Sequence, residues 1–534
     1  MTSKAVPPES MALSAAQRRK AGAPTRTGLA TGVMLVTMAT YLTYAVGVIS
    51  NAMVARGLGP VDFGRYVYVV WISGLLVVFS NNGLTTSGIR FVAELLGAGS
   101  IEAAQRTHGY LNRLSHYSQS AVLIGFAAIA LVIRPADWRH ALPLFVGVIL
   151  VSAFARARYL FDTSIAKGYS QFKIEAYSTV GVGLMTTLLV LVLYLMHARL
   201  AAYLLLFGFS GVIYWLAAAV QLRRVGVEPA LGRPESEVLA RLRPHLRWTA
   251  LLTAVGVFGN KSVEVFLLNA THGASDVGFF AIGAALTRGG IDLLTSGLMT
   301  VLMPVMSNAF GRGGEAQVNR IFVDSFRYLA FCGLIAAGAG FFLAVPTVEL
   351  LYGAAYTRAI TAFQVMVLVA GLTLGESAFG ALLSTTDRQR SRTVLVAVQI
   401  VITVVFAAVL IPKYGFIGAI LAHAASRLLG FALVFGWVSH MYSAKPPIPE
   451  LLRLLLAAAL AAAAAWGCVT TIHGLIGYAL ATLVYVLLLI TLSLVARCWT
   501  STDLALIARS LDRYVPNATR LRRWTASCGT RFGA

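Results

Sequence analysis

Long apolar stretches recur through this sequence and constrain its fold more than any other feature. They follow one another from residue 28 to residue 496, and each has about the 20 apolar residues that a helix needs to cross a bilayer. The 14 stretches are 28–52, 65–87, 114–133, 141–162, 175–196, 200–221, 247–270, 277–306, 323–345, 359–384, 393–411, 415–439, 452–471 and 475–496. Because open strands cannot satisfy their backbone in lipid, the pattern predicts an all-α integral membrane protein with about 14 transmembrane helices.

The composition excludes a soluble chain. Of the 534 residues, 58% are hydrophobic and 12% are charged, which is about half the charged fraction of an average soluble protein. The polar residues that remain are too few to cover the surfaces of several soluble domains. The net charge of +22 would suit a nucleic-acid partner only if the cations shared a solvated face.

The positions of the lysines and arginines predict the orientation of the chain instead. With the N-terminus in the cytoplasm, 33 of the 43 Lys and Arg residues fall in the alternate segments on the cytoplasmic side, and 7 fall in the opposite loops. Membrane proteins retain positive residues in the cytoplasm, so both termini are predicted to be cytoplasmic. Basic loops that face anionic lipid account for the net charge, and no nucleic-acid partner is expected.

An internal repeat predicts two lobes. Four positions of the first half match the second half at an offset of 214 residues: Gly59, Asp62, Gly64 and Gly83 fall on Gly273, Asp276, Gly278 and Gly297. Six spans per half is an even number, so both halves share one orientation, and such pairs of bundles enclose a central cavity. Asp62 and Asp276 are each expected to cap the N-terminus of an even-numbered span at its outer end.

The repeat and the charge pattern together divide the chain. The predicted parts are a basic cytoplasmic N-tail (1–27), an N-lobe of spans one to six (28–222), a basic cytoplasmic linker (223–247), a C-lobe of spans seven to twelve (248–440), an appended pair of helices (450–496) and a basic cytoplasmic C-tail (497–534).

Two regions of the sequence carry a family resemblance. The segment Ala55–Glu94 contains Leu-Gly-Pro, an acidic residue, Gly-x-Tyr, an apolar helix with a polar break, and then Arg-Phe. The segment Leu350–Gly430 contains "LLYGAAYTRAITAFQVM", "STTDRQR" and "LIPKYGFIGAILAHAASRLLG". In order and spacing these resemble bacterial polysaccharide (O-antigen) flippases of the Wzx type. These flippases belong to the multidrug/oligosaccharidyl-lipid/polysaccharide (MOP) exporter superfamily.

The resemblance implies two six-helix lobes of the MATE type and a transporter, not an enzyme. The implied load is an oligosaccharide repeat unit on undecaprenyl diphosphate. It would pass from the cytoplasmic to the periplasmic leaflet of the bacterial inner membrane by alternating access. The implied partners are this substrate, membrane lipids, a polysaccharide polymerase and a chain-length regulator. No cofactor or metal is expected, and coupling to protons or sodium is left open.

Ionisable residues inside the apolar stretches or at their ends are the candidate site residues. An ionisable side chain within a span usually faces a cavity or a partner, because lipid disfavours its charge. The candidates for a cationic substrate pocket are Arg427, Arg288, Lys261, Arg90 and Arg158. The candidates for gating or coupling are Glu376, Asp292, Glu264 and His423.

A structural role is the alternative for most of these residues. Lys261 with Glu264 and Arg288 with Asp292 are spaced to meet on one helix face, so each pair could neutralise itself and hold helices together. Arg427 has no acid nearby in its own span, which favours a substrate role. Glu376 is the only charged residue of its span, so it would either form an ion pair with Arg427 across the bundle or carry a coupling proton. His423 suits a hydrogen bond between helices as well as a proton site.

Three rival functions remain open on the sequence. A membrane polymerase or glycosyltransferase of the same pathway would need a larger outer loop bearing carboxylates or histidines. A cation-coupled exporter would favour acids inside the first lobe, where spans one, two, three and six have none. A lipid II flippase of the same superfamily also has 14 spans, and the sequence does not separate it from a polysaccharide flippase.

Overall fold

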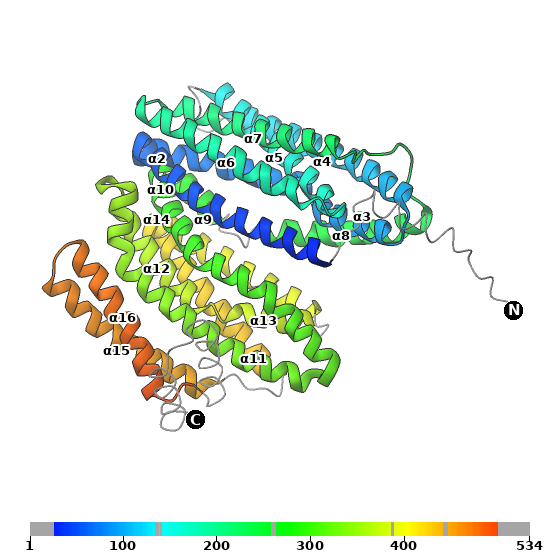
Figure 1. Ribbon diagram of the computed structural model, residues 1–534. Helices are drawn as coiled ribbons and strands as arrows, with labels where there is room; N and C mark the ends of the chain where they lie inside the picture. Colours follow the sequence, from blue (N-terminus) through cyan, green and yellow to red (C-terminus); the bar gives the residue numbers. More distant parts are fainter. Residues whose placement is uncertain are drawn as a thin grey trace. The chain divides into compact units, whose positions relative to one another are not determined.

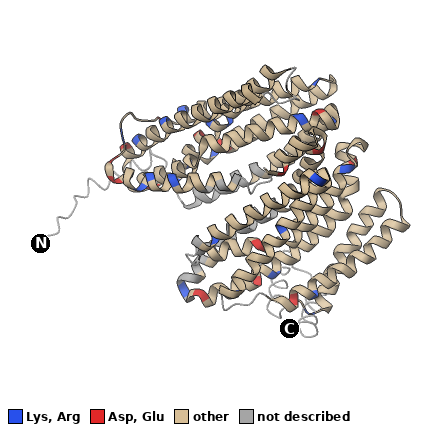
Figure 2. Cartoon of the chain, turned by 180° about the vertical axis from the view of Figure 1, so that it is seen from behind, with Lys and Arg blue, Asp and Glu red and all other residues tan. Residues whose placement is uncertain are grey.

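The computed structural model describes residues 26–133, 138, 141–257, 263–385, 389–441 and 447–499. These residues form helices joined by short turns, and they include no strand. The predicted all-α class is therefore confirmed. Charged side chains are sparse along the helices, and most of the helix surface is uncharged (Figure 2).

The chain divides into two compact units between Ser262 and Val263. The helices of the first unit are α2 (Arg26–Asn81), α3 (Leu84–Gly97), α4 (Ile101–Ile133), α5 (Leu142–Gly168), α6 (Phe172–Leu195), α7 (Leu200–Arg224) and α8 (Ser236–Val257) (Figure 1). Helix α5 packs against α2, α6 and α7, and its buried face is a core of small and aromatic residues. The predicted lobe and linker ranges stay predictions.

The second unit contains the remaining helices (Figure 1). They are α9 (Val263–Thr271), α10 (Ala274–Thr287), the π-helical turn η3 (Arg288–Asp292), α11 (Leu293–Tyr352), the short η4 (Ala354–Tyr356), α12 (Arg358–Leu372), α13 (Glu376–Thr385), α14 (Gln389–Met441), α15 (Ile448–Thr471) and α16 (Leu475–Val495). The pair α15 and α16 packs on α11 through an apolar cluster that includes Tyr485 and Leu454.

Nine helices in the described ranges are long and apolar enough to cross a membrane. The number becomes ten if the bent pair α12 and α13 is one span. Two of these helices merge neighbouring predicted spans across a kink. Helix α2 joins span one to most of span two at Gly59, and α14 joins spans eleven and twelve at Gly415. The exact count of 14 spans stays a prediction.

Glycines with positive φ form the turns at the predicted outer ends. Gly59 has φ 72° and ψ 171°, and Gly273, which lies 214 residues later, has φ 94° and ψ 176°. This combination is open almost only to glycine. These two glycines of the predicted repeat therefore share a backbone conformation.

The acids that follow these glycines each pair with an arginine. The N-cap of α10 is Gly273, without a side-chain capping bond, and Asp276 lies in the first turn. There it accepts a hydrogen bond from Arg358 at 3.2 Å. Asp62 pairs with Arg65 at 2.9 Å. The prediction that Asp276 caps its helix is wrong, because the helix begins two residues earlier, with the glycine as its cap.

The polar break predicted in span two is present. Helix α2 ends at Asn81 and α3 begins at Leu84, because Asn82 and Gly83 both have positive φ. A Cβ on Gly83 would lie 2.7 Å from the Thr249 side chain. Glycine is therefore required for the close approach of α8 as well as for the turn.

Candidate functional site

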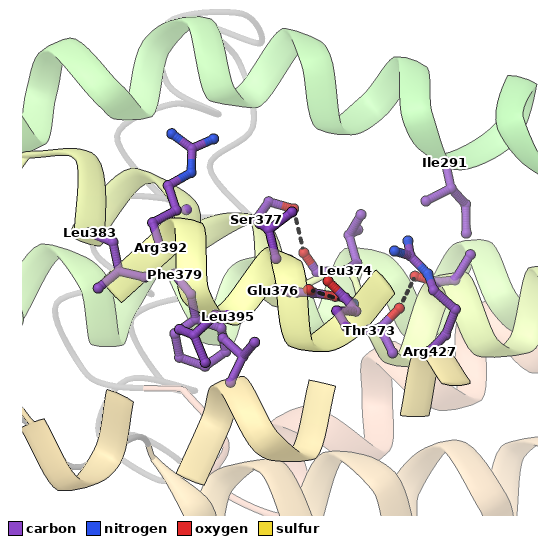
Figure 3. A pocket seen from close by; sticks show the side chains of 15 residues that line it. Ile291, Thr373, Leu374, Glu376, Ser377, Phe379, Leu383, Arg392, Leu395 and Arg427 are labelled. Carbon is purple, nitrogen blue, oxygen red and sulfur yellow. Dashed lines mark hydrogen bonds between the residues drawn. The ribbon is translucent and has the colours of Figure 1, made fainter. Parts of the chain in front are cut away.

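A pocket of ≈ 370 Å³ in the second unit contains two of the predicted residues, Glu376 and Arg427. It lies among α12, α13 and α14, with Ile291 of η3 at its border. Arg392 and Gln399 of α14 also line it. In the view of Figure 3, Glu376 lies between Arg392 and Arg427.

Arg427 is the free cation of this pocket. Its side chain is exposed, and it has no hydrogen bond or ion pair with any residue of the described ranges. Glu376 is half-buried and accepts a hydrogen bond from Gln399 Nε2 at 3.2 Å. The structure therefore brings Glu376 and Arg427 to one pocket without joining them in an ion pair. The pocket can offer a guanidinium to an anion and amide and carboxylate groups to hydroxyls.

Of the other two cations predicted for the second lobe, the structure describes Arg288 but not Lys261. Arg288 begins the π-helical turn η3 and is exposed. A π-turn inside an α-helix is frequent at functional sites, and this one brings the same turn to the border of the pocket through Ile291. The side chain of Asp292 and the whole of Lys261 lie outside the described residues, so the two predicted pairs stay predictions.

Glu264 and His423 face each other inside the second unit. The Glu264 side chain is 1% exposed, and its Oε1 lies 3.8 Å from Nδ1 of His423. Its other oxygen, Oε2, is buried without a hydrogen-bond partner, and the ring of Phe280 meets the His423 ring edge-on. The two residues lie on α9 and α14, so the pair links two helices that are far apart in sequence.

In the first unit, Arg158 is already paired. It donates from Nη2 to Asp162 at 3.0 Å and from Nη1 to Asn112 at 2.9 Å. Both side chains of the ion pair are buried. A buried guanidinium that is neutralised in this way holds α5 to α4 and leaves less of its charge for a substrate.

Arg90 lies at the surface of the first unit, on the amphipathic helix α3. Its Nη1 is 3.2 Å from Nδ1 of His245 on α8, and Glu94 of the same helix pairs with Arg241 at 2.7 Å. Burial, and to a smaller extent the charge of Arg90, lowers the pKa of His245. These contacts fix α3 against α8, and Arg90 is exposed beside them.

Arg156 is not among the residues predicted for the substrate pocket. The predicted span 141–162 places it near the inner end of span four, but α5 continues to Gly168. Arg156 therefore lies near the middle of its helix, where it donates to Ser210 of α7 at 3.2 Å. One sequence signal could have identified it: Arg158 has an acid four residues later, Asp162, and Arg156 has none at that spacing.

Comparison with known families agrees with this architecture. The family model described as "Polysaccharide biosynthesis protein" matches residues 29–310, which is more than half of the chain. The chain belongs to this family. The resemblance expected from the segment Ala55–Glu94 is therefore confirmed. No curated protein matches the chain significantly.

Solved structures of the MOP superfamily share the fold. The lipid II flippase MurJ, in an inward closed conformation, superposes with a TM-score of 0.64 at 14% identity, over 86% of this chain and 98% of that one. An inward-facing MATE family multidrug resistance transporter gives 0.59 at 16% identity, over 75% and 95%. A MOP superfamily transporter from Pyrococcus furiosus gives 0.53 at 17% identity, over 76% and 95%. At these identities the likeness shows the fold alone.

Proposed function

We propose that the protein is a flippase that moves an oligosaccharide linked to undecaprenyl diphosphate from the cytoplasmic to the periplasmic leaflet of the bacterial inner membrane. The observation that carries this proposal is Arg427, which lines the pocket of the second unit and has no hydrogen bond or ion pair among the residues that the structure describes. A planar guanidinium offers paired donors to a phosphate and stays charged in apolar surroundings. Gln399 and Glu376, in the same pocket, supply hydrogen-bonding groups for sugar hydroxyls.

The family supports a polysaccharide precursor as the load. A lipid II flippase is the second candidate, because MurJ matches over nearly its whole length. Both substrates would carry the same diphosphate, so the pocket serves either. A strain that lacks the protein separates them: accumulation of a lipid-linked oligosaccharide supports the first, and accumulation of lipid II supports the second. The polymerase and the chain-length regulator are proposed partners on the family resemblance alone.

The variant Arg427→Ala tests the pocket. We expect it to abolish glycan export while the protein still inserts, and Arg427→Lys to restore export only in part, because an ammonium lacks the bidentate fork. Export is measured as surface glycan per molecule of inserted protein. Normal export by Arg427→Ala would contradict the proposed role of this pocket.

The buried pair Glu264 and His423 is proposed as the coupling site. The Glu264 carboxylate is 1% exposed and lies 3.8 Å from the His423 ring, and chains of acidic residues and histidines inside membrane proteins often form proton relays. We expect Glu264→Gln to remove the dependence of transport on the proton gradient in proteoliposomes. A sodium gradient imposed at constant pH is the matched control. Transport that follows sodium alone would contradict a proton site.

A further inference from the structure

A polar stripe on α5 faces the interior of the first unit. Ser152, Arg156, Tyr159 and Thr163 recur at helical spacing and so share one face. Three of them bond to three different helices: Ser152 to Ser73 of α2 at 2.9 Å, Arg156 to Ser210 of α7 at 3.2 Å, and Tyr159 to Thr179 of α6 at 2.7 Å. The stripe therefore runs where four helices meet.

Arg156 is the one cation of this stripe, and aromatic rings surround it. Its guanidinium carbon lies 4.4 Å from the ring centre of Phe207 and 5.9 Å from that of Tyr214. Tyr66 and Tyr159 extend this aromatic group, because the ring centre of Tyr66 lies 6.1 Å from that of Phe207 and the ring centre of Tyr159 lies 5.2 Å from that of Tyr214. The side chain is half-buried, and its Nε is buried without an acceptor.

No carboxylate balances Arg156 among the described residues. Its only hydrogen bond there is to the neutral hydroxyl of Ser210. Arg158, two residues on, is neutralised within the same helix, because it pairs with Asp162. Arginine cannot lose its proton in a protein, so Arg156 keeps a full positive charge and unused donors.

The position along the helix makes this charge unusual. Arg156 is 14 residues after Leu142 and 12 residues before Gly168, or about 21 Å and about 18 Å from the two ends of α5 at the α-helical rise. Helix α5 is long and apolar enough to span a bilayer. A charge at mid-span marks a functional site unless a partner explains it.

We propose that Arg156, Tyr66, Tyr159 and Tyr214 form a second binding site that takes an oxyanion carried on a sugar ring. The guanidinium would bind the oxyanion, and the tyrosines offer ring faces to the sugar and hydroxyls to its hydroxyl groups. The proposal rests on the proposed transport of a lipid-linked glycan. The oxyanion has two sources in such a substrate: the carboxylate of an acidic sugar, or the phosphate on the first sugar.

Small soluble probes test the site in the full-length protein in lipid nanodiscs. Saturation-transfer NMR detects weak binding of glucuronic acid, glucose 1-phosphate and neutral methyl glucoside. We expect the two anionic sugars, or one of them, to show ring-proton signals and the neutral sugar to show none. Signal from glucuronic acid alone identifies an acidic sugar as the source, and signal from glucose 1-phosphate alone identifies the phosphate.

Variants assign the binding to Arg156. We expect Arg156→Gln to weaken anionic-sugar binding by about tenfold or more, as the loss of a charge-assisted hydrogen bond would, and Arg156→Lys to weaken it less. Arg199→Gln is the matched control, because it removes the same charge from an exposed position at the start of α7. We expect the control to bind as the wild type does.

Two results would overturn the site. One is a wild type that does not distinguish anionic from neutral sugars, and this comparison needs no variant to fold. The other is binding that survives Arg156→Gln in the folded protein and disappears only in Arg427→Gln, which would leave the pocket of the second unit standing alone. Export and binding are measured for the same variant, so the two proposals can fail separately. A variant that binds the anionic sugars but does not export glycan contradicts only the transport role of this site, and a variant that exports glycan without binding them contradicts only the site.

Discussion

At the scale of single residues, Arg156 and Arg158 lie two positions apart on α5 and differ in the groups that surround their charges. Arg158 pairs with the buried Asp162, four residues later on the same helix, and the i, i+4 spacing alone predicts this pair. The structure gives Arg156 the rings of Phe207 and Tyr214 on α7, and no local pattern encodes these contacts.

The Arg158–Asp162 pair is predicted to be structural. Arg158→Ala leaves the buried carboxylate of Asp162 unpaired and should lower the free energy of unfolding by about 3–5 kcal/mol. Replacing both residues, Arg158→Met with Asp162→Leu, removes both charges and should recover most of this loss. Thermal unfolding in detergent reports the stability of each variant. A double variant that is as unstable as the single one would show that Arg158 acts through other contacts.

At the scale of elements, hydropathy located helices well and their junctions poorly. Every predicted span has helix in its described part, because a run of about 20 apolar residues in lipid has no other regular structure open to it. The sequence did not predict that neighbouring spans would run together across a kink in α2 and in α14. These kinks depend on the backbone angles of Gly59 and Gly415, and the presence of a glycine in a sequence does not predict a positive φ. The break at Asn81-Asn82-Gly83 could be predicted from the sequence, because three neighbouring residues there disfavour a helix.

The paired outer glycines give a prediction about stability. A Cβ on Gly59 or on Gly273 would meet no atom within 4 Å, so any cost of Ala at these positions comes from the backbone conformation. We expect Gly59→Ala and Gly273→Ala each to lower the free energy of unfolding by about 1–3 kcal/mol. Thermal unfolding of the purified protein measures both changes.

Gly181 provides the control for this pair. It also has open space around it, but it lies within α6 and has no positive φ. Gly181→Ala should be neutral or stabilising by up to about 1 kcal/mol, because alanine favours helix. Equal losses at all three positions would mean that the turn conformation is not the reason for the glycines.

At the scale of the whole molecule, the charge pattern carries information that the fold does not. The shared MOP fold shows helices and their order, whereas the sidedness of the chain rests on the predicted placement of 33 of its 43 cations in alternate segments. Two of the 33, Arg156 and Arg158, lie well inside α5 in the structure, and the other 31 keep the asymmetry. The repeat adds a second constraint. Gly59 and Gly273 share their backbone conformation, and an even number of spans between them would place both turns on the same side of the membrane.

Reporter fusions test this topology at three points. Fusions after Arg247 and after Arg497 should be active as cytoplasmic reporters, and a fusion after Arg139 should be active as a periplasmic one. The expectation for Arg247 is the most informative, because it requires six spans before the basic segment 223–247. A periplasmic signal there would require an odd number of spans, and the turns at Gly59 and Gly273 would then face opposite sides. The two halves would be inverted relative to each other, and a parallel repeat with both termini in the cytoplasm would be wrong.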